Sequence, residues 1–192
     1  KCGKTTYLNA LYILYLEHMA QLANVCGKKA DAQTYLGKAT QMREKVRELL
    51  YCPEKRAFCD AWRAGKLIPV FSQQSNFAAI LADIATTAQT EQILDVALHD
   101  NNCITPGSAS TYWVVFAALA KAGRFEIIEH IMRQYWGAML DRGATTWWEV
   151  YNPSLPSWTY PHVFLGHCPL PEHDWIPVSC CHAWSAVPGY AI

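Results

Sequence analysis

The sequence predicts an all-α fold in which two kinds of helix alternate along the chain. Three segments are apolar on nearly every side, and each is followed by a segment with one apolar and one polar face. A two-layered α/α toroid produces this alternation, because its inner helices are covered on both sides while its outer helices face water. Periodicity leaves an irregular helical bundle open as the alternative.

The first pair of helices shows the alternation most clearly. Residues Thr6–Val25 are apolar almost all round, which predicts a helix buried on most sides, and Gly27 ends it. Residues Ala32–Leu50 instead place apolar side chains at three- and four-residue steps and fill the other face with Lys, Arg and Glu. We therefore expect an inner helix followed by a surface helix.

The same order recurs twice further along the chain. Residues Phe77–Ala85 are apolar, and Thr90 followed by Glu91 predicts the N-cap of a shorter amphipathic helix. Residues Tyr112–Ala120 are again apolar all round, and apolar side chains at helical spacing follow as far as Met139. Three hairpins of inner and outer helix result.

Long connections separate these helices, and long ordered loops in compact domains tend to be functional. Strands Phe58–Trp62 and Lys66–Val70, turned around Gly65, predict a short β-hairpin. Residues Asn101–Ser110 form a second loop. The third loop, Thr145–Cys180, is rich in Trp, His and Pro, and its prolines exclude a regular helix.

Composition excludes several classes of protein. With 52% apolar and 17% charged residues among 192, the chain is too hydrophobic to be disordered and long enough for one domain, residues 1–192. Its net charge is zero and no apolar run reaches the length of a bilayer span, so we expect no nucleic-acid partner and no membrane. All 16 Lys and Arg lie in the first 142 residues, which leaves these at +3 and the last 50 at −3.

Cysteine and histidine chemistry predicts no metal and no other cofactor. The eight cysteines show no regular spacing, and we expect most of them to be small buried hydrophobic residues. Several His and Cys crowd near the C-terminus without the paired knuckles typical of structural zinc sites. This group comprises His162, His167, Cys168, His173, Cys180, Cys181 and His182. The compartment stays open between periplasm and cytoplasm.

Residues Gly143–Glu149 are the most informative segment for function. Glu149 directly follows two tryptophans in a region without Lys or Arg, and such a carboxylate suits general acid or base chemistry. Aromatic rings beside carboxylates are also typical of sugar sites. The alternative is an exposed loop Glu149 whose neighbouring Trp147 and Trp148 pack into the core.

Four motifs together resemble a known family. They are Gly143–Glu149 (GATTWWE), Ser179–Pro188 (SCCHAWSAVP), Ser72–Ala78 (SQQSNFA) and Gly107–Tyr112 (GSASTY). They are similar to motifs of the bacterial α-L-rhamnosidases of glycoside hydrolase family 78. The resemblance implies a six-hairpin (α/α)6 barrel, of which about three and a half hairpins are present here, and hydrolysis of terminal α-L-rhamnosides with inversion. It also implies a rhamnose-containing glycan or glycoside as the ligand.

The resemblance assigns roles to five residues. Glu149 matches the general base, His182 and Trp184 match positions that line the sugar subsite, and Trp147 and Trp148 flank the base. The family's general acid belongs to an acidic cluster upstream that nothing in this sequence matches. We therefore expect the chain to be the C-terminal portion of a catalytic barrel, inactive alone, whose exposed inner helices are covered by the missing barrel half or by a second copy.

Two other functions stay open at this stage. One is another α/α-barrel glycosidase acting on a different sugar or a uronide. A uronide enzyme needs a cationic group for the substrate carboxylate, and no Lys or Arg follows residue 142. The other is a non-catalytic carbohydrate-binding or helical scaffold protein, in which Glu149 would be dispensable.

Overall fold

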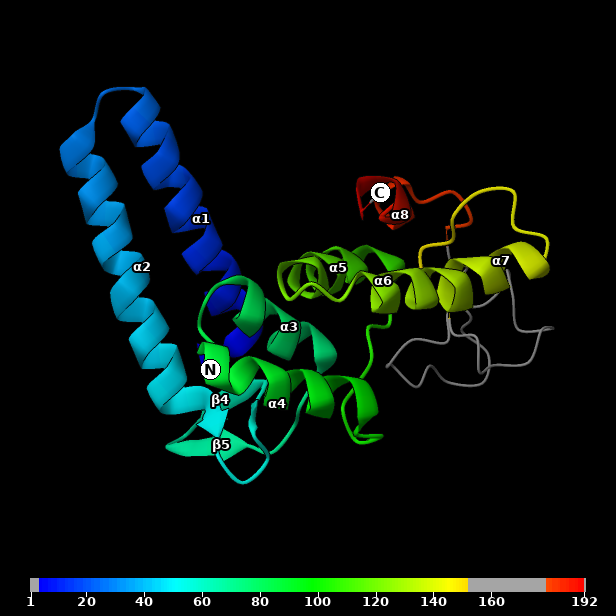
Figure 1. Cartoon of the computed structure of the whole chain (residues 1–192), viewed down its shortest axis with the longest axis horizontal. Helices are drawn as coiled ribbons and strands as arrows, with labels where there is room; N and C mark the ends of the chain where they lie inside the picture. Colours follow the sequence, from blue (N-terminus) through cyan, green and yellow to red (C-terminus); the bar gives the residue numbers. More distant parts are fainter. Residues whose placement is uncertain (1–3, 152–178, 192) are drawn as a thin grey trace. The chain divides into compact units, whose positions relative to one another are not determined.

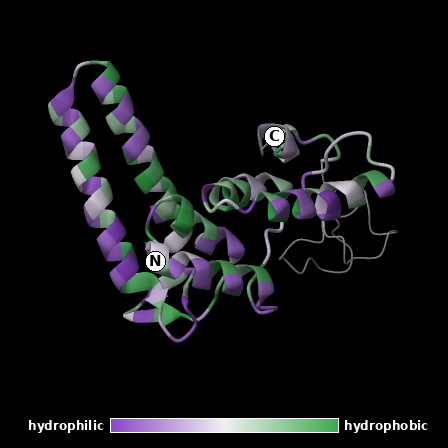
Figure 2. Cartoon of the chain, in the orientation of Figure 1, coloured by the Kyte–Doolittle hydropathy of each residue, from purple (hydrophilic) through white to green (hydrophobic). Residues whose placement is uncertain are grey.

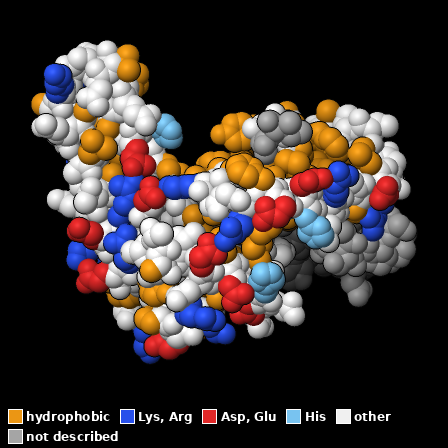
Figure 3. Space-filling view, viewed as in Figure 1, with side chains coloured by type: hydrophobic (Ala, Val, Ile, Leu, Met, Phe, Trp, Pro, Cys, Tyr) orange, Lys and Arg blue, Asp and Glu red, His pale blue; other side chains and the backbone are white. Residues whose placement is uncertain are grey.

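The computed structural model describes residues 4–151 and 179–191 and divides into two compact units, Lys1–Thr105 and Pro106–Ile192. Helices make up most of the described residues of both units, and short strands occur among those of the first (Figure 1). On the face shown in Figure 3, acidic and basic side chains are interspersed over the first unit, and hydrophobic side chains gather over the second. No helix in the described residues is both long enough and apolar enough to cross a membrane.

The first unit begins with a helical hairpin. Helices α1 (Thr6–Val25) and α2 (Lys29–Leu50) lie side by side and are joined by a tight turn, in which Gly27 has a φ of 74° (Figure 1). Arg43 of α2 forms an ion pair with Glu17 of α1. The predicted bounds of α1 are confirmed, and α2 begins three residues earlier than its apolar pattern indicated.

The prediction that α1 is buried on most sides is wrong for the described structure. Its buried face consists of small and aliphatic side chains, but five of its large apolar side chains are exposed. These are Leu8 (64%), Tyr12 (47%), Tyr15 (53%), Leu22 (55%) and Val25 (85%). The reason is that α1 packs against α2 and α3, which cover only one side of it. In Figure 2, α1 carries more hydrophobic residues than α2.

Helix α3 (Gln73–Leu81) begins and ends four residues earlier than the predicted apolar segment, Phe77–Ala85. Ser72 is its N-cap and accepts a hydrogen bond from the amide of Ser75 at 3.3 Å. Asp83 then takes a φ of 55°, which turns the chain out of the helix. Arg43 and Arg47 of α2 donate to the carbonyl oxygens of Ala82 and Ile84 at 2.7 and 2.8 Å and hold this turn.

Helix α4 (Thr87–His99) corrects the predicted N-cap at Thr90. Thr86 caps the helix instead, because its side chain accepts from the amide of Gln89 while the Gln89 side chain accepts from the amide of Thr86. This reciprocal pair is a capping box, and it satisfies two amides that would otherwise lack partners. Thr90 lies inside the first turn, where its hydroxyl donates to the carbonyl of Thr86.

Two small antiparallel sheets lie at one end of this unit. Strands β1 (Lys4–Thr5), β4 (Ala61–Arg63) and β5 (Lys66–Ile68) form one sheet in the order β1-β4-β5, and β2 (Tyr51–Cys52) pairs with β3 (Ala57–Phe58). The predicted hairpin is present as β4 and β5. Its predicted first strand is divided between the two sheets, because the amides of Cys59 and Asp60 donate to different partners, Leu50 and Val70.

The second unit is helical in its described residues. The 3-10 helix η1 (Ala109–Thr111) leads into α5 (Tyr112–Lys121), and α6 (Phe125–Met132) follows. The predicted outer helix then continues through a π-helical turn, η2 (Arg133–Gly137), into α7 (Ala138–Asp141). After residues 152–178, the chain forms η4 (Ala183–Ser185) and α8 (Pro188–Ala191), and α8 packs against α5.

The cysteine prediction is wrong for most of the six cysteines that the structure describes. Only Cys59 and Cys103 are buried, and burial raises their thiol pKa to about 12 and about 11. Two others are exposed and two are half-exposed, because they lie at a helix end, in a short hairpin or in the loop before η4. They are Cys26, Cys52, Cys180 and Cys181.

Candidate functional site

A hydroxyl residue stands where each of the three apolar helices begins, and its backbone or side chain bonds to the next long connection. Thr6 starts α1, and its amide donates to the carbonyl of Asp60 at 3.0 Å. Ser72, the N-cap of α3, forms a β-bridge with Ile104. Ser108 precedes η1 and forms a bridge with Val150. The segment that contains Glu149 is therefore fixed at the start of α5.

The two C-terminal motifs, 30 residues apart, lie alongside one another in the second unit. The amide of Glu149 donates to the carbonyl of Ser179, and the amide of His182 donates to the carbonyl of Trp147, both at 2.9 Å. A third hydrogen bond joins the same two segments, in which the hydroxyl of Thr146 donates to the carbonyl of Cys180. This backbone pairing brings Glu149 and His182, both predicted site residues, into one small region.

Glu149 is half-buried and is held from two sides. Its carbonyl oxygen accepts a hydrogen bond from the Ser108 hydroxyl at 3.0 Å, and its carboxylate oxygen Oε2 accepts from the amide of Ser179 at 3.4 Å. No ion pair to the Glu149 carboxylate occurs among residues 4–151 and 179–191. The carboxylate is thus oriented by backbone while one oxygen stays available to a further donor such as water.

A buried aromatic cluster packs against the segment that contains Glu149. Trp148 is only 4% exposed, and its ring meets Tyr151 edge to face at 5.8 Å. Tyr151 in turn contacts Tyr135 at 5.4 Å, and the Arg142 guanidinium lies 5.1 Å over the Tyr151 ring and donates to its hydroxyl. Such edge-to-face and cation–π contacts add to the burial of these rings.

The same cluster anchors the second motif. Trp136 contacts both Tyr135 and Tyr112, at 4.9 and 5.4 Å, and its indole Nε1 donates to the carbonyl of Ser185 at 2.8 Å. Ser185 is fully buried. In the sequence, Trp136 belongs to the apolar pattern of the helix that runs to Met139, and no motif marks Tyr151 or Arg142, although Tyr151 lies two residues after Glu149.

The remaining predicted site residues differ in exposure. Trp147 and His182 are half-buried, whereas Trp184 is 78% exposed. The rings of His182 and Trp184 meet edge to face at 6.0 Å. Trp147, His182 and Trp184 therefore retain free ring surface, which could stack on the CH face of a sugar, and the Trp148 ring is packed inside.

The described part of the chain contains no cluster of side chains suited to bind a metal ion. Among residues 4–151 and 179–191, no three His, Cys, Asp or Glu side chains are arranged to hold an ion. Cys180, Cys181 and His182 belong to that part. The other members of the crowded group lie outside the described residues: His162, His167, Cys168 and His173.

Comparison with known proteins identifies the family of this chain. The profile of the bacterial alpha-L-rhamnosidase 6 hairpin glycosidase domain matches residues 3–190, which is nearly the whole chain. The chain belongs to this family. The predicted family and partial six-hairpin fold are thereby confirmed. The comparison with curated proteins gave no match.

Two solved structures resemble this six-hairpin glycosidase domain. The GH78 family rhamnosidase of Bacillus sp. GL1 is 30% identical with a TM-score of 0.82, and the match covers 98% of this chain and 19% of that one. The rhamnosidase from Klebsiella oxytoca, solved with rhamnose bound, is 22% identical with a TM-score of 0.74, over 96% of this chain and 33% of that one. At that identity the second likeness concerns the fold. The domain thus spans about a fifth and a third of the two chains.

Proposed function

We propose that this domain supplies the general base of an enzyme that hydrolyses terminal α-L-rhamnosides with inversion, and that Glu149 is that base. The observation that carries the proposal is the backbone pairing of the two motifs, which brings the half-buried Glu149 into one region with the half-buried Trp147 and His182. Family membership and the Bacillus relative support a glycosidase, because both are rhamnosidases by description.

In this proposal the Glu149 carboxylate accepts a proton from water as that water attacks the anomeric carbon. Attack from the face opposite the leaving oxygen inverts the configuration, and a second carboxylic acid, roughly 6.5–9.5 Å from the base, protonates the leaving oxygen. The resemblance offers no residue of this chain for that acid. The rhamnose subsite uses the rings of Trp147, His182 and Trp184, while Trp148 holds the base segment against Tyr151.

The decisive experiment is Glu149→Gln in the full-length enzyme. Loss of a general base lowers turnover of an aryl α-L-rhamnoside by about 100- to 10,000-fold, while rhamnose binding stays close to that of the wild type, since the rings are unchanged. Glu126→Gln, at an exposed position on α6, is the matched control and leaves both unchanged. Near-normal hydrolysis by Glu149→Gln would contradict the assignment and favour a different base or a non-catalytic domain.

A second experiment uses the chain of 192 residues alone. We expect it to leave an aryl α-L-rhamnoside intact, because no residue of this chain matches the family's general acid. Appreciable turnover would show that the acid lies within the chain. Hydrolysis by the full-length enzyme of a different α-linked sugar in preference to rhamnose would retain Glu149 as base but change the substrate class.

A further inference from the structure

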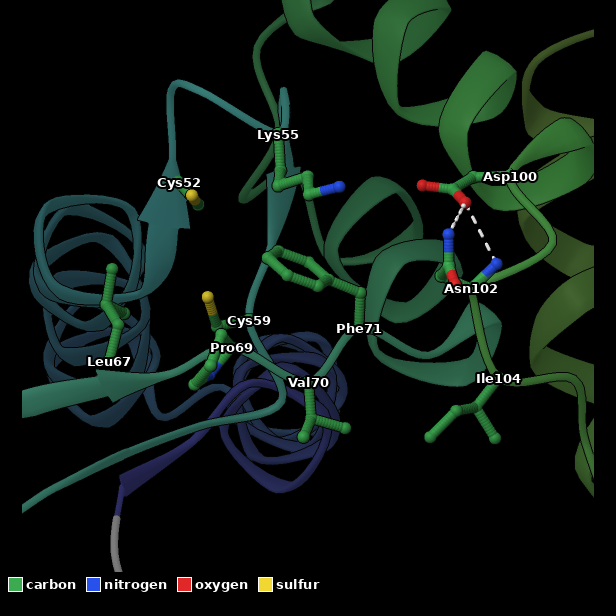
Figure 4. Close-up of a pocket in the computed structure, with 10 residues that line it drawn as sticks. All are labelled: Cys52, Lys55, Cys59, Leu67, Pro69, Val70, Phe71, Asp100, Asn102 and Ile104. Atoms are coloured by element: carbon green, nitrogen blue, oxygen red, sulfur yellow. Dashed lines mark hydrogen bonds between the residues drawn. The ribbon is translucent and has the colours of Figure 1, made fainter.

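A cavity of about 330 Å³ lies in the first unit, and the proposed function uses none of its lining residues (Figure 4). It is formed by the hairpins that follow α2, by the segment before α3 and by the loop after α4. Its volume is that of a site for one small organic molecule. The lining residues are Cys52, Lys55, Cys59, Leu67, Pro69, Val70, Phe71, Asp100, Asn102 and Ile104.

Backbone hydrogen bonds fix the walls of this cavity. The amide of Ile104 donates to the carbonyl of Phe71, and the amide of Gln73 donates to the carbonyl of Ile104, both at 2.9 Å. The carbonyl of Val70 accepts from the amide of Asp60 at 2.8 Å. Three segments distant in sequence are thereby tied together, so a ligand would enter a site that is already formed.

Most of the cavity surface is apolar. Val70 and Ile104, which line it, are 38% and 45% exposed and so leave apolar surface in contact with water. Figure 4 shows the ring of Phe71 between Cys59 and Asp100, with Val70 and Ile104 below it. A flat apolar ring would cover these side chains and gain by removing them from water.

Two opposite charges face one another at the polar side of the cavity. The Lys55 ammonium is directed toward the Asp100 carboxylate in Figure 4, but no ion pair joins them in the described structure. One Asp100 oxygen already accepts from the amide and the side-chain nitrogen of Asn102, both at 2.9 Å. These bonds lower the pKa of Asp100, which is therefore charged at neutral pH.

A hydroxyl group suits the space between an ammonium and a carboxylate, because it accepts from one and donates to the other. An anionic ligand would meet the Asp100 charge, and a cationic ligand would meet the Lys55 charge. We propose that this cavity binds an uncharged aromatic alcohol, with its ring against Phe71, Val70 and Ile104 and its hydroxyl between Lys55 and Asp100. This site is independent of Glu149 and of the proposed hydrolysis.

The probe for this site is 4-methylphenol, titrated into the full chain while the amide resonances are followed by NMR. We expect saturable shifts at Val70, Phe71 and Ile104. Because each hydrogen bond to the hydroxyl is expected to contribute about five-fold to affinity, 4-methylanisole, which cannot donate, binds about five-fold more weakly. Lys55→Met weakens 4-methylphenol by a similar factor, and Lys66→Met, at an exposed lysine of β5 outside the cavity, leaves it unchanged.

Asp100→Asn separates the ligand contact from folding. An asparagine oxygen can still accept from Asn102, so the turn is preserved, but the charged acceptor of the phenol is lost. We expect the preference for 4-methylphenol over 4-methylanisole to shrink in this variant. Absence of saturable shifts at the three wall residues, an unchanged preference in Asp100→Asn, or tighter binding of rhamnose at the same amides would each overturn the proposal.

Discussion

Glu149 and Ser179 are hydrogen-bonded in both directions. The amide of Glu149 donates to the carbonyl of Ser179 at 2.9 Å, and the amide of Ser179 donates to the Glu149 carboxylate at 3.4 Å. The first bond sets the path of the main chain, and the second orients the side chain from the same residue. The position of the proposed base therefore depends on a segment 30 residues away and on the contacts that hold that segment in place.

Ser108 is the residue that ties this arrangement to the start of α5. Ser108→Ala removes the hydroxyl that donates to the Glu149 carbonyl, so we expect kcat of the full-length enzyme to fall by several-fold to about 100-fold with little change in KM, because the base is misplaced while the sugar contacts remain. Ser108→Thr keeps a hydroxyl and should restore most of kcat. Steady-state kinetics checks both variants.

The matched control for this prediction is Ser110→Ala. Ser110 shares a hydrogen bond with Ser108 but makes none with Glu149 in the described structure. Ser110→Ala should therefore leave kcat close to the wild-type value. If Ser108→Ala lowers only the stability, and its kcat equals that of Ser110→Ala, then Ser108 is not a positioning residue.

Local rules predicted the helices well and their starts less well. The apolar run from Thr6 and the run from Tyr112 begin where the structure begins α1 and α5, because burial of one or more faces repeats with the helical period. The start of α4 was missed, although Thr86 and Gln89 have the spacing of a capping box. The exposed side of α1 could not be predicted, since its apolar residues alone do not say what covers them.

The sequence names candidate site residues, but it does not indicate the contacts between them. Glu149 and His182 belong to motifs that the sequence shows, yet the backbone bonds that join them run between irregular segments and have no period. The bond from Ser108 spans 41 residues and uses one hydroxyl among many. The rings of Trp148 and Tyr151 meet and lie only three residues apart in the chain, but the backbone between them is irregular, so no repeat in the sequence indicates that Trp148 is buried and Trp147 is not.

The indole of Trp136 holds the second motif through the Ser185 carbonyl. Trp136→Phe keeps an aromatic ring but leaves that buried carbonyl without its donor, which is expected to lower the free energy of unfolding by about 1–3 kcal/mol. Trp184→Phe, at a residue that is 78% exposed, should change it by less than about 0.5 kcal/mol. Urea unfolding measures both, and equal effects would show that the indole hydrogen bond contributes nothing specific.

The turn between β4 and β5 places an alanine in the left-handed region. Ala64 has a φ of 50° and Gly65 a φ of 83°, and the left-handed conformation costs an L-residue about 1–2 kcal/mol. Ala64→Asn should therefore stabilise the protein by up to about 1 kcal/mol, because Asn tolerates this conformation. Gly65→Ala should destabilise it by about 1 kcal/mol through backbone strain, since an added Cβ meets no atom within 4 Å. Opposite shifts in the urea midpoint test the turn, and shifts of the same sign would refute it.

Tyr112 makes the stability of the protein fall at high pH. Burial raises the pKa of its hydroxyl from 10.0 to about 12, because the phenolate is poorly solvated inside the aromatic cluster. The folded state thus keeps its proton between about pH 10 and pH 12 while the unfolded state loses it, so the stabilisation is complete below pH 10 and disappears as the pH rises through 12.

Tyr112→Phe isolates this contribution, because Phe fills nearly the same volume and has no proton to lose. A shift from 10.0 to about 12 corresponds to about 2–3 kcal/mol in the free energy of unfolding. The free energy of unfolding of the variant should therefore rise by this amount relative to that of the wild type between pH 9 and about pH 12. Ionisation of Cys59 and Cys103 also lowers the free energy of unfolding in this pH range, and it does so in both proteins. The measurement is therefore the difference between the two proteins in the free energy of unfolding as a function of pH. A difference that does not vary with pH would mean that the Tyr112 hydroxyl ionises equally easily in the folded and unfolded states.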